Sequence, residues 1–300
     1  MLVASARALF YPCRFLEYRG FMNILLFGAS GFIGSRIAAV LRARGHTLTT
    51  PSHREADFFA LDPARVRPLF AGQDLVVNAV GIMHRRADAL ETVHHHAPAQ
   101  LAAWAVEAGV PRWVQLSALG ADAAHPVVFV GSKGRGDAAV VASGMQVAIA
   151  RPSLVYGRGG HSTELFLKLT RLPVLALPAG GRFALQPVHV QDVADGMAAL
   201  VADAPAHGTV MNMCGAEVLS LAAYLGVLRQ TMHRRRPPRI LPIPLALLRP
   251  FLPLTNLLSN GVLSAGNIRL LQEGSTADNH AFAALLQRAP LAPAAFAAQP

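Results

Sequence analysis

The sequence predicts an α/β fold: a doubly wound parallel sheet with a smaller irregular C-terminal lobe. Short apolar runs alternate with helical patterns along the first half of the chain. Strands separated by helices in this rhythm form right-handed βαβ units, which place the strands in one parallel sheet. The composition agrees, since 53% of the 300 residues are hydrophobic and only 15% are charged. Such a chain can bury a sheet between two layers of helices.

Each element is expected from its own pattern. The apolar run Asn23–Gly28 predicts a buried strand, and the segment after it has apolar residues at helical spacing until Gly45. HTLTT is expected to form a second strand and Ala56–Phe58 a short third one. The alternation continues with a helix in PARVRPLFAG, a strand in Asp74–Gly81, a long helix ending at Gly109, a strand in RWVQLSALG, a helix from FVGSK to about Ala142 and a strand in Gln146–Gly157.

The pattern loosens after residue 157, where strand-like and helical pieces alternate irregularly among prolines. We therefore expect residues 22–157 to form the core, and residues 158–300 to hold the remaining strands and a C-terminal substrate or docking lobe. Residues 1–21 are expected to be a loose arm or a start-site artefact, because charged residues interrupt any signal-type apolar run. No transmembrane helix is expected, since no run of about 18 apolar residues is free of charge.

The charge of the chain is strongly basic, at a formal +10, with 25 Arg and two Lys. A basic surface suits nucleic acid, an anionic membrane or phosphorylated ligands. The arginines are scattered, and the one dense run, His233–Arg239, has no interleaved aromatics, so a solvated loop is expected there and no nucleic-acid partner. Cys13 and Cys214 form no CxxC pair, which fits a reducing, cytoplasmic location.

A glycine-rich segment, GASGFIG, follows the first strand and opens the first helix. That context is what a dinucleotide-binding loop requires: glycines allow the tight turn, the approach of a pyrophosphate and the close packing of helix on strand. Backbone amides at the helix start then face the phosphates. We expect residues 22–157 to bind a dinucleotide, and the cofactor-binding residues of this loop to be Gly28, Ser30, Gly31, Phe32, Ile33 and Gly34.

The spacing G-x-x-G-x-x-G resembles the short-chain dehydrogenase/reductase superfamily, in its extended and atypical branches. Four further segments agree in order, namely NAVG, QLSALGAD, RPSLVYG and QPVHVQDVADGM. The subgroup most similar is the one related to the nucleotide-binding accessory subunit of respiratory complex I. The resemblance implies a Rossmann-type fold. It also implies adenine-side contacts from Asn78, Ala79, Val80 and Gly81, a catalytic serine at Ser117 and a nicotinamide-lining position at Pro152.

The end of the second strand indicates which nicotinamide cofactor is preferred. An acid there would bond both ribose hydroxyls and select NAD. The chain instead has Ser52, His53 and Arg54, with no acid until Glu55. A guanidinium offers a planar fork to a 2′-phosphate, so we favour NADP(H) over NAD(H). By resemblance Asp57 would touch the adenine amine; the alternative is an acid that bonds nearby backbone amides.

The segment FVGSK lacks the proton donor of the superfamily. By resemblance, a tyrosine four residues before the lysine donates the proton, and the lysine both lowers the pKa of that tyrosine and holds the nicotinamide ribose. Phe129 stands four residues before Lys133, and a phenylalanine cannot exchange a proton. Losing a positioned acid–base group costs about 10²–10⁴ in rate. Lys133 is therefore expected to be kept for cofactor binding.

Other side chains could substitute for the missing phenol. Tyr156 follows the sixth strand, and His125 precedes the FVGSK helix.

The consecutive histidines 94–96 would point about 100° apart on an α-helix, so they are not expected to converge on a metal. His189 and Asp192 are expected to make a structural hydrogen bond at a helix start. No metal site is predicted.

The leading hypothesis is an NADP(H)-binding protein of the atypical short-chain dehydrogenase type with weak or no dehydrogenase activity. The resemblance implies a structural or redox-sensing role beside a respiratory complex or at the inner face of a membrane. The apolar, proline-rich segment from Ile240 to Leu258 has two interpretations, a docking face and ordinary packing of the small lobe, and packing is preferred. The alternative is an NAD(P)-dependent oxidoreductase or sugar-nucleotide epimerase/dehydratase, in which Ser117 polarises a carbonyl and Tyr156 or His125 supplies the proton. A nucleic-acid-binding regulator is a third class that no motif supports.

Overall fold

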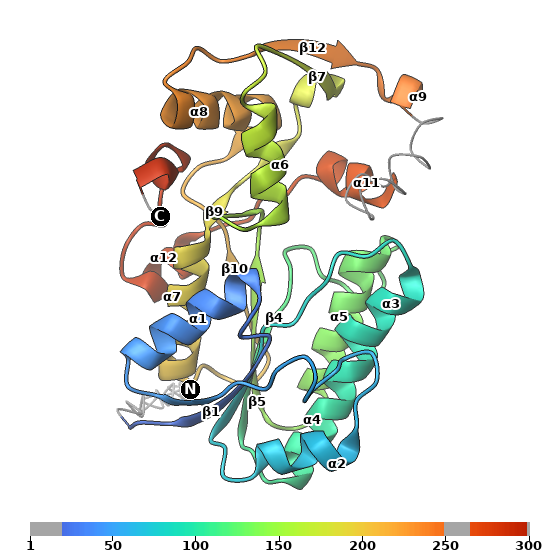
Figure 1. The fold of residues 1–300 in the computed structure, drawn as a ribbon, viewed down its shortest axis with the longest axis vertical. Helices are drawn as coiled ribbons and strands as arrows, with labels where there is room; N and C mark the ends of the chain where they lie inside the picture. The colour runs from blue at the N-terminus through green and yellow to red at the C-terminus, as the bar shows by residue number, and fades with distance from the viewer. Residues whose placement is uncertain (1–19, 249–264, 299–300) are drawn as a thin grey trace, which may run out of the picture.

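The computed structural model in Figure 1 describes residues 20–248 and 265–298. Residues 1–19 of the expected N-terminal arm, Cys13 among them, and the end of the expected docking face, from residue 249 on, lie outside the described residues. None of the helices in the part that is described is long and apolar enough to cross a membrane.

The main sheet has six strands, all parallel, in the order β10-β5-β4-β3-β1-β2. Its strands are β1 Asn23–Phe27, β2 Thr47–Thr49, β3 Leu75–Asn78, β4 Arg112–Leu116, β5 Gln146–Pro152 and β10 Thr209–Met213. The central strands are nearly continuous apolar runs because helices cover both faces of the sheet. The predicted doubly wound parallel α/β fold is confirmed.

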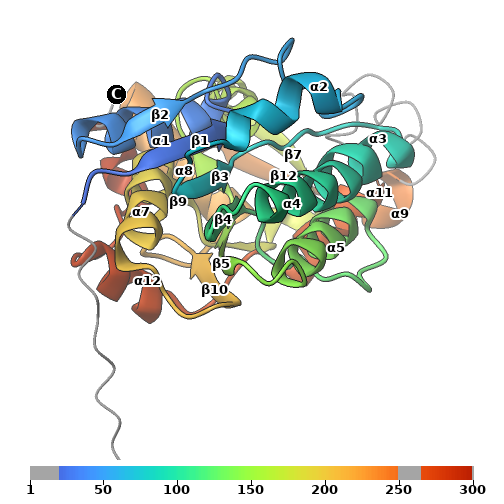
Figure 2. The ribbon, with the colours of Figure 1, turned by 90° about the horizontal axis from the view of Figure 1, so that it is seen from below.

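Two helical layers cover the sheet (Figure 2). Helices α1 (Phe32–Ala43) and α7 (Val190–Asp203) pack on one face, where Ile24 and Leu26 of β1 point. The next residues along that strand, Leu25 and Phe27, point to the opposite face and its separate core, since side chains alternate along a strand. That second face is covered by α3 Ala87–Glu91, the π-helix η2 Thr92–His96, α4 Ala97–Glu107 and α5 Val128–Val141.

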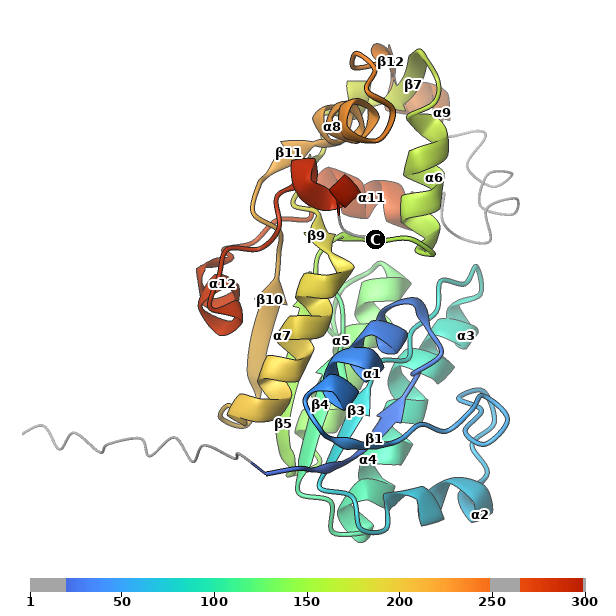
Figure 3. The same ribbon diagram turned by 60° about the vertical axis from the view of Figure 1, so that its left-hand side comes forward.

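The C-terminal lobe has a core of its own, built around Tyr156, Tyr224 and Phe296. Residues beyond 157 also return to the main sheet, since they supply α7 and β10, and α12 (His280–Leu286) packs against both (Figure 3). The lobe elements are α6 His161–Leu169, β7 Val174–Pro178, η3 Ala179–Gly181, α8 Leu221–His233, β12 Arg239–Ile243, α9 Leu245–Leu248, α11 Ala265–Glu273 and η5 Pro293–Ala298. Short strand pairs complete it: β7 with β12, β6 Val155–Tyr156 with β9 Val188–His189, and β8 Ala184–Leu185 with β11 Leu219–Ser220.

The expected short strand at Ala56–Phe58 is wrong. The backbone amides of Glu55 and Ala56 both bond to the Ser52 carbonyl, and the amide of Ala60 bonds to that of Asp57. These local bonds fold the segment into turns and leave no ladder to β2. Its apolar side chains are still buried: the Phe58 ring packs edge-on against Phe27, with centroids 5.7 Å apart. The apolar residues at 56–58 therefore reflect burial of a turn and not a strand of the sheet.

The long helix expected after Asp74–Gly81 is continuous but not uniform. It starts as α3, widens into the π-helix η2 and continues as α4 to Glu107, two residues before the expected end at Gly109. The helix expected in PARVRPLFAG, before β3, is divided into α2 (Pro63–Val66) and the 3₁₀ turn η1 (Arg67–Phe70), and Asp62 caps α2 by accepting a bond from the Ala64 amide. π-Helical turns inside α-helices are rare, and many of them occur at functional sites.

Replacing Gly34 by alanine is expected to destabilise the fold. A Cβ at Gly34 would lie 2.8 Å from the carbonyl carbon of Gly28 and closer still to its oxygen, so α1 must move off β1. Overpacking of this kind is expected to lower the free energy of unfolding by about 1–3 kcal/mol. Urea denaturation of the variant and of the unmodified chain measures this difference. Gly226→Ala in α8 is the control, because its Cβ would meet only Pro237 at 3.5 Å. That variant should be neutral or gain roughly 0.5–1 kcal/mol. Equal stabilities of the two variants would contradict the close contact.

Candidate functional site

The glycine loop joins β1 to α1 at the carboxyl edge of the sheet. Gly28 has φ +82°, and a Cβ on it would lie 2.9 Å from the carbonyl carbon of Ala79. Gly31 is the N-cap of α1 and places no capping side chain over the helix start. The first amides of α1, at Phe32, Ile33 and Gly34, are therefore left for an external acceptor at the positive end of the helix dipole. Ser30 is exposed beside them.

Phe32 links this loop to the segment that leaves β6. A Cβ at Gly157 or Gly160 would lie 3.0 Å or 2.9 Å from Cζ of Phe32, so the ring packs directly on both glycines. The Arg36 guanidinium lies 4.9 Å over the same ring, and its Nη2 donates to the Arg158 carbonyl at 2.8 Å. The start of α1 and the β6 exit therefore form one packed unit around the expected phosphate position.

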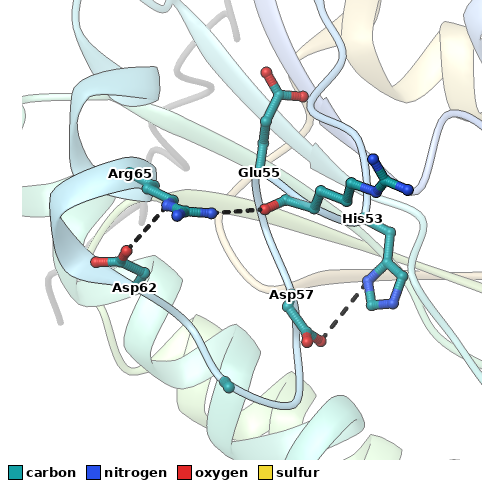
Figure 4. Close-up of a pocket in the computed structure, with 7 residues that line it drawn as sticks. His53, Glu55, Asp57, Asp62 and Arg65 are labelled. Atoms are coloured by element: carbon teal, nitrogen blue, oxygen red, sulfur yellow. Dashed lines mark hydrogen bonds and ion pairs between the residues drawn. The ribbon is translucent and has the colours of Figure 1, made fainter.

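A pocket of about 400 Å³ lies beside the end of β2 (Figure 4). Its acids are engaged locally: Glu55 accepts from the Ser52 amide at 2.7 Å, Asp57 from Phe59 at 2.9 Å and Asp62 from Ala64 at 3.0 Å. The first of these bonds lowers the pKa of Glu55. The remaining lining residues are His53, Arg54, Ala60 and Arg65.

The basic residues of the pocket differ in their partners. Arg65 lies 3.2 Å from the Asp62 carboxylate and donates to the Arg54 carbonyl at 3.5 Å, and His53 lies 3.7 Å from Asp57. The Arg54 guanidinium makes no hydrogen bond or ion pair with any other described residue. Asp57 bonds a nearby backbone amide, as the alternative interpretation of that acid expected.

The NAVG segment closes the edge of the sheet between the glycine loop and β4. Asn78 is fully buried: its Oδ1 accepts from the Val80 amide at 3.1 Å and its Nδ2 donates to Gln115 at 3.1 Å. The Ala79 amide bonds to the Phe27 carbonyl at 3.0 Å. These bonds fix the turn that carries Gly81. Pro152, at the end of β5, holds the loop after Ser117 through its carbonyl, which accepts from Leu119 at 2.9 Å.

Lys133 is buried at the same edge. Its Nζ donates to the Leu116 carbonyl at 3.4 Å and lies 3.3 Å from the position that a Cβ on Gly81 would occupy. Burial lowers the pKa of Lys133 to about 8, although the nearby Asp137 opposes the shift. An ammonium group has three donors, and only one long bond to a described residue uses them. Lys133 therefore retains donors for hydroxyl groups of a ligand.

Phe129 lies beside His94, with ring centroids 5.6 Å apart in an edge-to-face arrangement. His94 Nε2 accepts from the Ile82 amide at 3.1 Å and its Nδ1 lies 3.1 Å from Ser132 Oγ. Burial, helped by the charge of Lys133, lowers the pKa of His94 to about 2. The imidazole is neutral at physiological pH, and both of its nitrogens are engaged.

Ser117 is bonded to a carboxylate that the sequence reasoning missed. Its hydroxyl donates to Asp137 Oδ2 at 2.7 Å, and Arg151 Nη2 donates to the same oxygen at 3.0 Å. Oδ1 of Asp137 is buried without a partner in the described structure. Burial raises the pKa of Asp137 against the opposing effects of Ser117, Arg151 and Lys133. The available signal was spacing, since Asp137 follows Lys133 by one helical turn.

The two expected substitutes for the phenol are held elsewhere. Tyr156 stacks on Phe296 with centroids 4.7 Å apart, and its hydroxyl lies 3.9 Å from Met232 Sδ in the lobe core. Burial raises the pKa of Tyr156. His125 lies 3.1 Å from Glu273 through one ring nitrogen and accepts from the Val127 amide through the other. These contacts favour structural roles for both.

His189 has the structural role expected of it. Its Nδ1 accepts from the Gln191 amide at 3.2 Å and caps α7. Asp192 in the same helix is fully buried, lies 2.6 Å from Arg288 and accepts from the Leu291 amide at 2.8 Å. The pair therefore fixes the helix start and the returning C-terminal segment rather than a reacting group.

The three consecutive histidines divide between two directions. His94 faces Lys133 and Phe129, whereas a ring nitrogen of His95, a ring nitrogen of His96 and a carboxylate oxygen of Glu91 all lie within 4.8 Å of one another. The expectation that neighbouring histidines cannot converge is wrong for His95 and His96, because it assumed an α-helix and these residues form a π-helix. The sequence contained a signal for the inward direction of His94. Position 94 continues the apolar stripe of Leu90, Ala97 and Leu101, all of which are buried.

Comparisons with known proteins agree with these motifs. Residues 24–127 match the model of the NAD dependent epimerase/dehydratase family. NADH dehydrogenase (ubiquinone) 1 alpha subcomplex subunit 9, mitochondrial, of Arabidopsis thaliana is 28% identical over 74% of this chain, and its Mus musculus counterpart is 25% identical over 73%. The chain spans 60% and 63% of the length of these two relatives.

Solved structures share the fold at low sequence identity. MoeE5 in complex with UDP-glucose and NAD aligns with a TM-score of 0.66 and 17% identity, over 90% of this chain and 94% of that one. RMD from Pseudomonas aeruginosa complexed with NADPH aligns with a TM-score of 0.60 and 18% identity, over 74% and 86%.

Acid is expected to destabilise the protein through His94. The pKa of His94 is about 2 in the fold and 6.5 as an ordinary histidine, so between these values the unfolded chain binds more protons. The free energy of unfolding should therefore fall as pH decreases below about 6.5. Thermal midpoints measured from pH 7.5 to 4.5 should fall more steeply for the unmodified chain than for His94→Gln. His280→Gln, at an exposed site, should keep the original slope; equal slopes for all three would contradict a buried neutral imidazole.

Proposed function

We propose that this chain, which resembles the NAD dependent epimerase/dehydratase family in sequence and the extended short-chain dehydrogenases/reductases in motifs and fold, holds NADP(H) and turns it over weakly or not at all. Nicotinamide dinucleotide binding is supported by the family match and the glycine loop. The observation that carries the proposal is Phe129, a ring without a hydroxyl one helical turn before the buried Lys133 in α5.

The residues at the sheet edge fit the parts of such a cofactor. The amides of Phe32 to Gly34 would bind the diphosphate, with Gly31 leaving the approach open. The donors of Lys133 would hold the nicotinamide ribose, and the free guanidinium of Arg54 would bind the 2′-phosphate. A bound nicotinamide supplies hydride transfer; the chain supplies position and charge.

The proton that hydride transfer needs has no evident donor among these groups. Phe129 has no hydroxyl, and both nitrogens of His94 are engaged. Ser117 gives its hydrogen to Asp137. An absent acid–base group costs about 10²–10⁴ in rate. The geometry therefore favours retention of the cofactor over turnover.

We further propose that the protein is a structural or redox-sensing component associated with a respiratory complex, cytoplasmic and peripheral at the inner face of a membrane. The relatives named as NADH dehydrogenase subunits support this role. The C-terminal lobe offers a surface that suits docking: residues 171–182 and 233–248 carry six Arg and no acid. Leu172, Val174 and Leu241 are about half exposed there. No nucleic-acid partner is proposed.

An oxidoreductase or a sugar-nucleotide epimerase/dehydratase with a relocated donor is the second candidate. The observation that favours it is the Ser117–Asp137 pair, since a buried carboxyl with a raised pKa could return a proton to the serine. Ser117 would then polarise a carbonyl. Tyr156 and His125, the donors expected from sequence, are engaged in the contacts described above.

Arg54→Ala is expected to weaken NADPH binding by at least about tenfold, as one lost charge-assisted bond costs about 1.5–3 kcal/mol, and to leave NADH binding unchanged. The measurement is a fluorescence titration of both cofactors. Arg44→Ala, an exposed arginine outside the pocket, is the matched control. Equal losses for both cofactors, or no loss for either, would refute the 2′-phosphate assignment.

Phe129→Tyr is expected to create or raise turnover, because it places a phenol next to the ammonium of Lys133. Carbonyl and sugar-nucleotide substrates are screened with NADPH, and absorbance of the reduced cofactor is followed. A gain of about 10²-fold or more is expected. Phe129→Leu, which changes the same side chain without adding a hydroxyl, should stay inactive. Robust turnover by the unmodified chain would contradict the proposal and favour the second candidate, an oxidoreductase or epimerase/dehydratase.

A further inference from the structure

Glu91, His95 and His96 gather where α3 meets the π-helix η2. Glu91 is the last residue of α3, and both histidines belong to η2. One ligand atom from each lies within 4.8 Å of the others. Nothing in the proposed cofactor site uses them.

The π-helix is what brings the three together. On an α-helix, residues i and i+4 share a face, but i+5 lies well round the cylinder, since each residue turns the chain by about 100°. A π-helix bonds i to i+5 and is therefore wider. On the wider turn His95 and His96, at i+4 and i+5, come to lie on either side of the direction of Glu91. Their rings stack with centroids 4.6 Å apart at 30°, which aligns two imidazoles side by side.

The carboxylate of Glu91 is oriented and ionised before any ligand arrives. Arg135 of α5 bonds both of its oxygens, through Nη2 to Oε1 and through Nε to Oε2 at 3.1 Å. These bonds lower the pKa of Glu91. His95 Nδ1 lies 3.3 Å from Oε2. Carboxylates that bind metals are commonly held in this way by outer donors, and Oε1, which accepts one bond from Arg135, keeps a further lone pair. The charge of Arg135 will reduce the affinity for a cation.

We propose that Glu91, His95 and His96 form a binding site for a divalent transition-metal ion of the Zn²⁺ class. Two imidazoles and one carboxylate suit Zn²⁺, whereas Mg²⁺ and Ca²⁺ prefer oxygen ligands throughout. Glu91 and His95 are half-buried and His96 is exposed, so the ion can enter from solvent. The fourth position of a tetrahedral site remains open to water.

The ion would act on the part of the fold that carries His94. It would link the end of α3 to the π-helix through Glu91 and the two histidines. Because His94 lies between His95 and Val93 in that turn and packs on Phe129, fixing the turn also fixes the inward-facing imidazole. Bound Zn²⁺ should therefore raise the thermal stability of the chain.

The test is a Zn²⁺ titration of the full chain, without a histidine tag and after treatment with a chelator, against a chromophoric competitor. One Zn²⁺ per chain is expected, together with a raised thermal midpoint. His95→Ala and His96→Ala should each weaken binding by at least about tenfold. Co²⁺ in place of Zn²⁺ should give visible absorption bands that both variants lose.

His280→Ala is the matched control, because His280 is an exposed histidine 2.7 Å from a carboxylate, that of Asp278; it should bind Zn²⁺ like the unmodified chain. Far-UV circular dichroism checks that each variant is folded, and Glu91→Gln, which keeps the shape of the side chain, gives a second route if an alanine variant is not. Absence of binding by the unmodified chain, retention in the double His95/His96 variant, or an equal loss in His280→Ala overturns the site. NADPH binding is measured separately, so failure of the cofactor proposal would be seen on its own.

Discussion

The contact between Gly34 and the Gly28 carbonyl is the constraint on which the site depends. It lets the start of α1 lie directly against the exit of β1, and only a residue without a Cβ fits there. The same approach points the first amides of α1 across the carboxyl edge of the sheet. It also sets Phe32 on Gly157 and Gly160, so the first crossover and the β6 exit share one packing unit. A shift of α1 would disturb both.

Burial governs the chemistry of the polar groups at that edge. Lys133, His94 and Asp137 are all nearly inaccessible to solvent. Burial lowers the pKa of Lys133 and His94 and raises the pKa of Asp137, so it favours the neutral form of each side chain. Their hydrogen bonds connect α5, η2 and the ends of β3 and β4 into one network. Within this network the lysine keeps free donors while the serine and histidine are engaged.

The π-helix η2 belongs to this network on one face and carries a different group of side chains on the other. Its widening turns His94 inward to Phe129 and Ser132, and turns His95 and His96 outward to Glu91. On a regular α-helix His96, five residues after Glu91, would lie well round the cylinder from it. One irregular turn therefore separates a buried structural imidazole from two that are open to a ligand.

Local patterns in the sequence were sufficient for the parallel sheet, the glycine-rich turn after β1 and the cap at His189, because strand periodicity and turn chemistry depend on near neighbours. They failed where distant segments decided the outcome. The apolar residues 56–58 are buried without joining the sheet, the pairing of Ser117 with Asp137 depends on how α5 packs on β4, and the engagement of Tyr156 depends on Phe296 from the end of the chain. The widening of the helix at 92–96 was likewise not predicted, because the buried positions 90, 94, 97 and 101 keep the spacing of an ordinary α-helix.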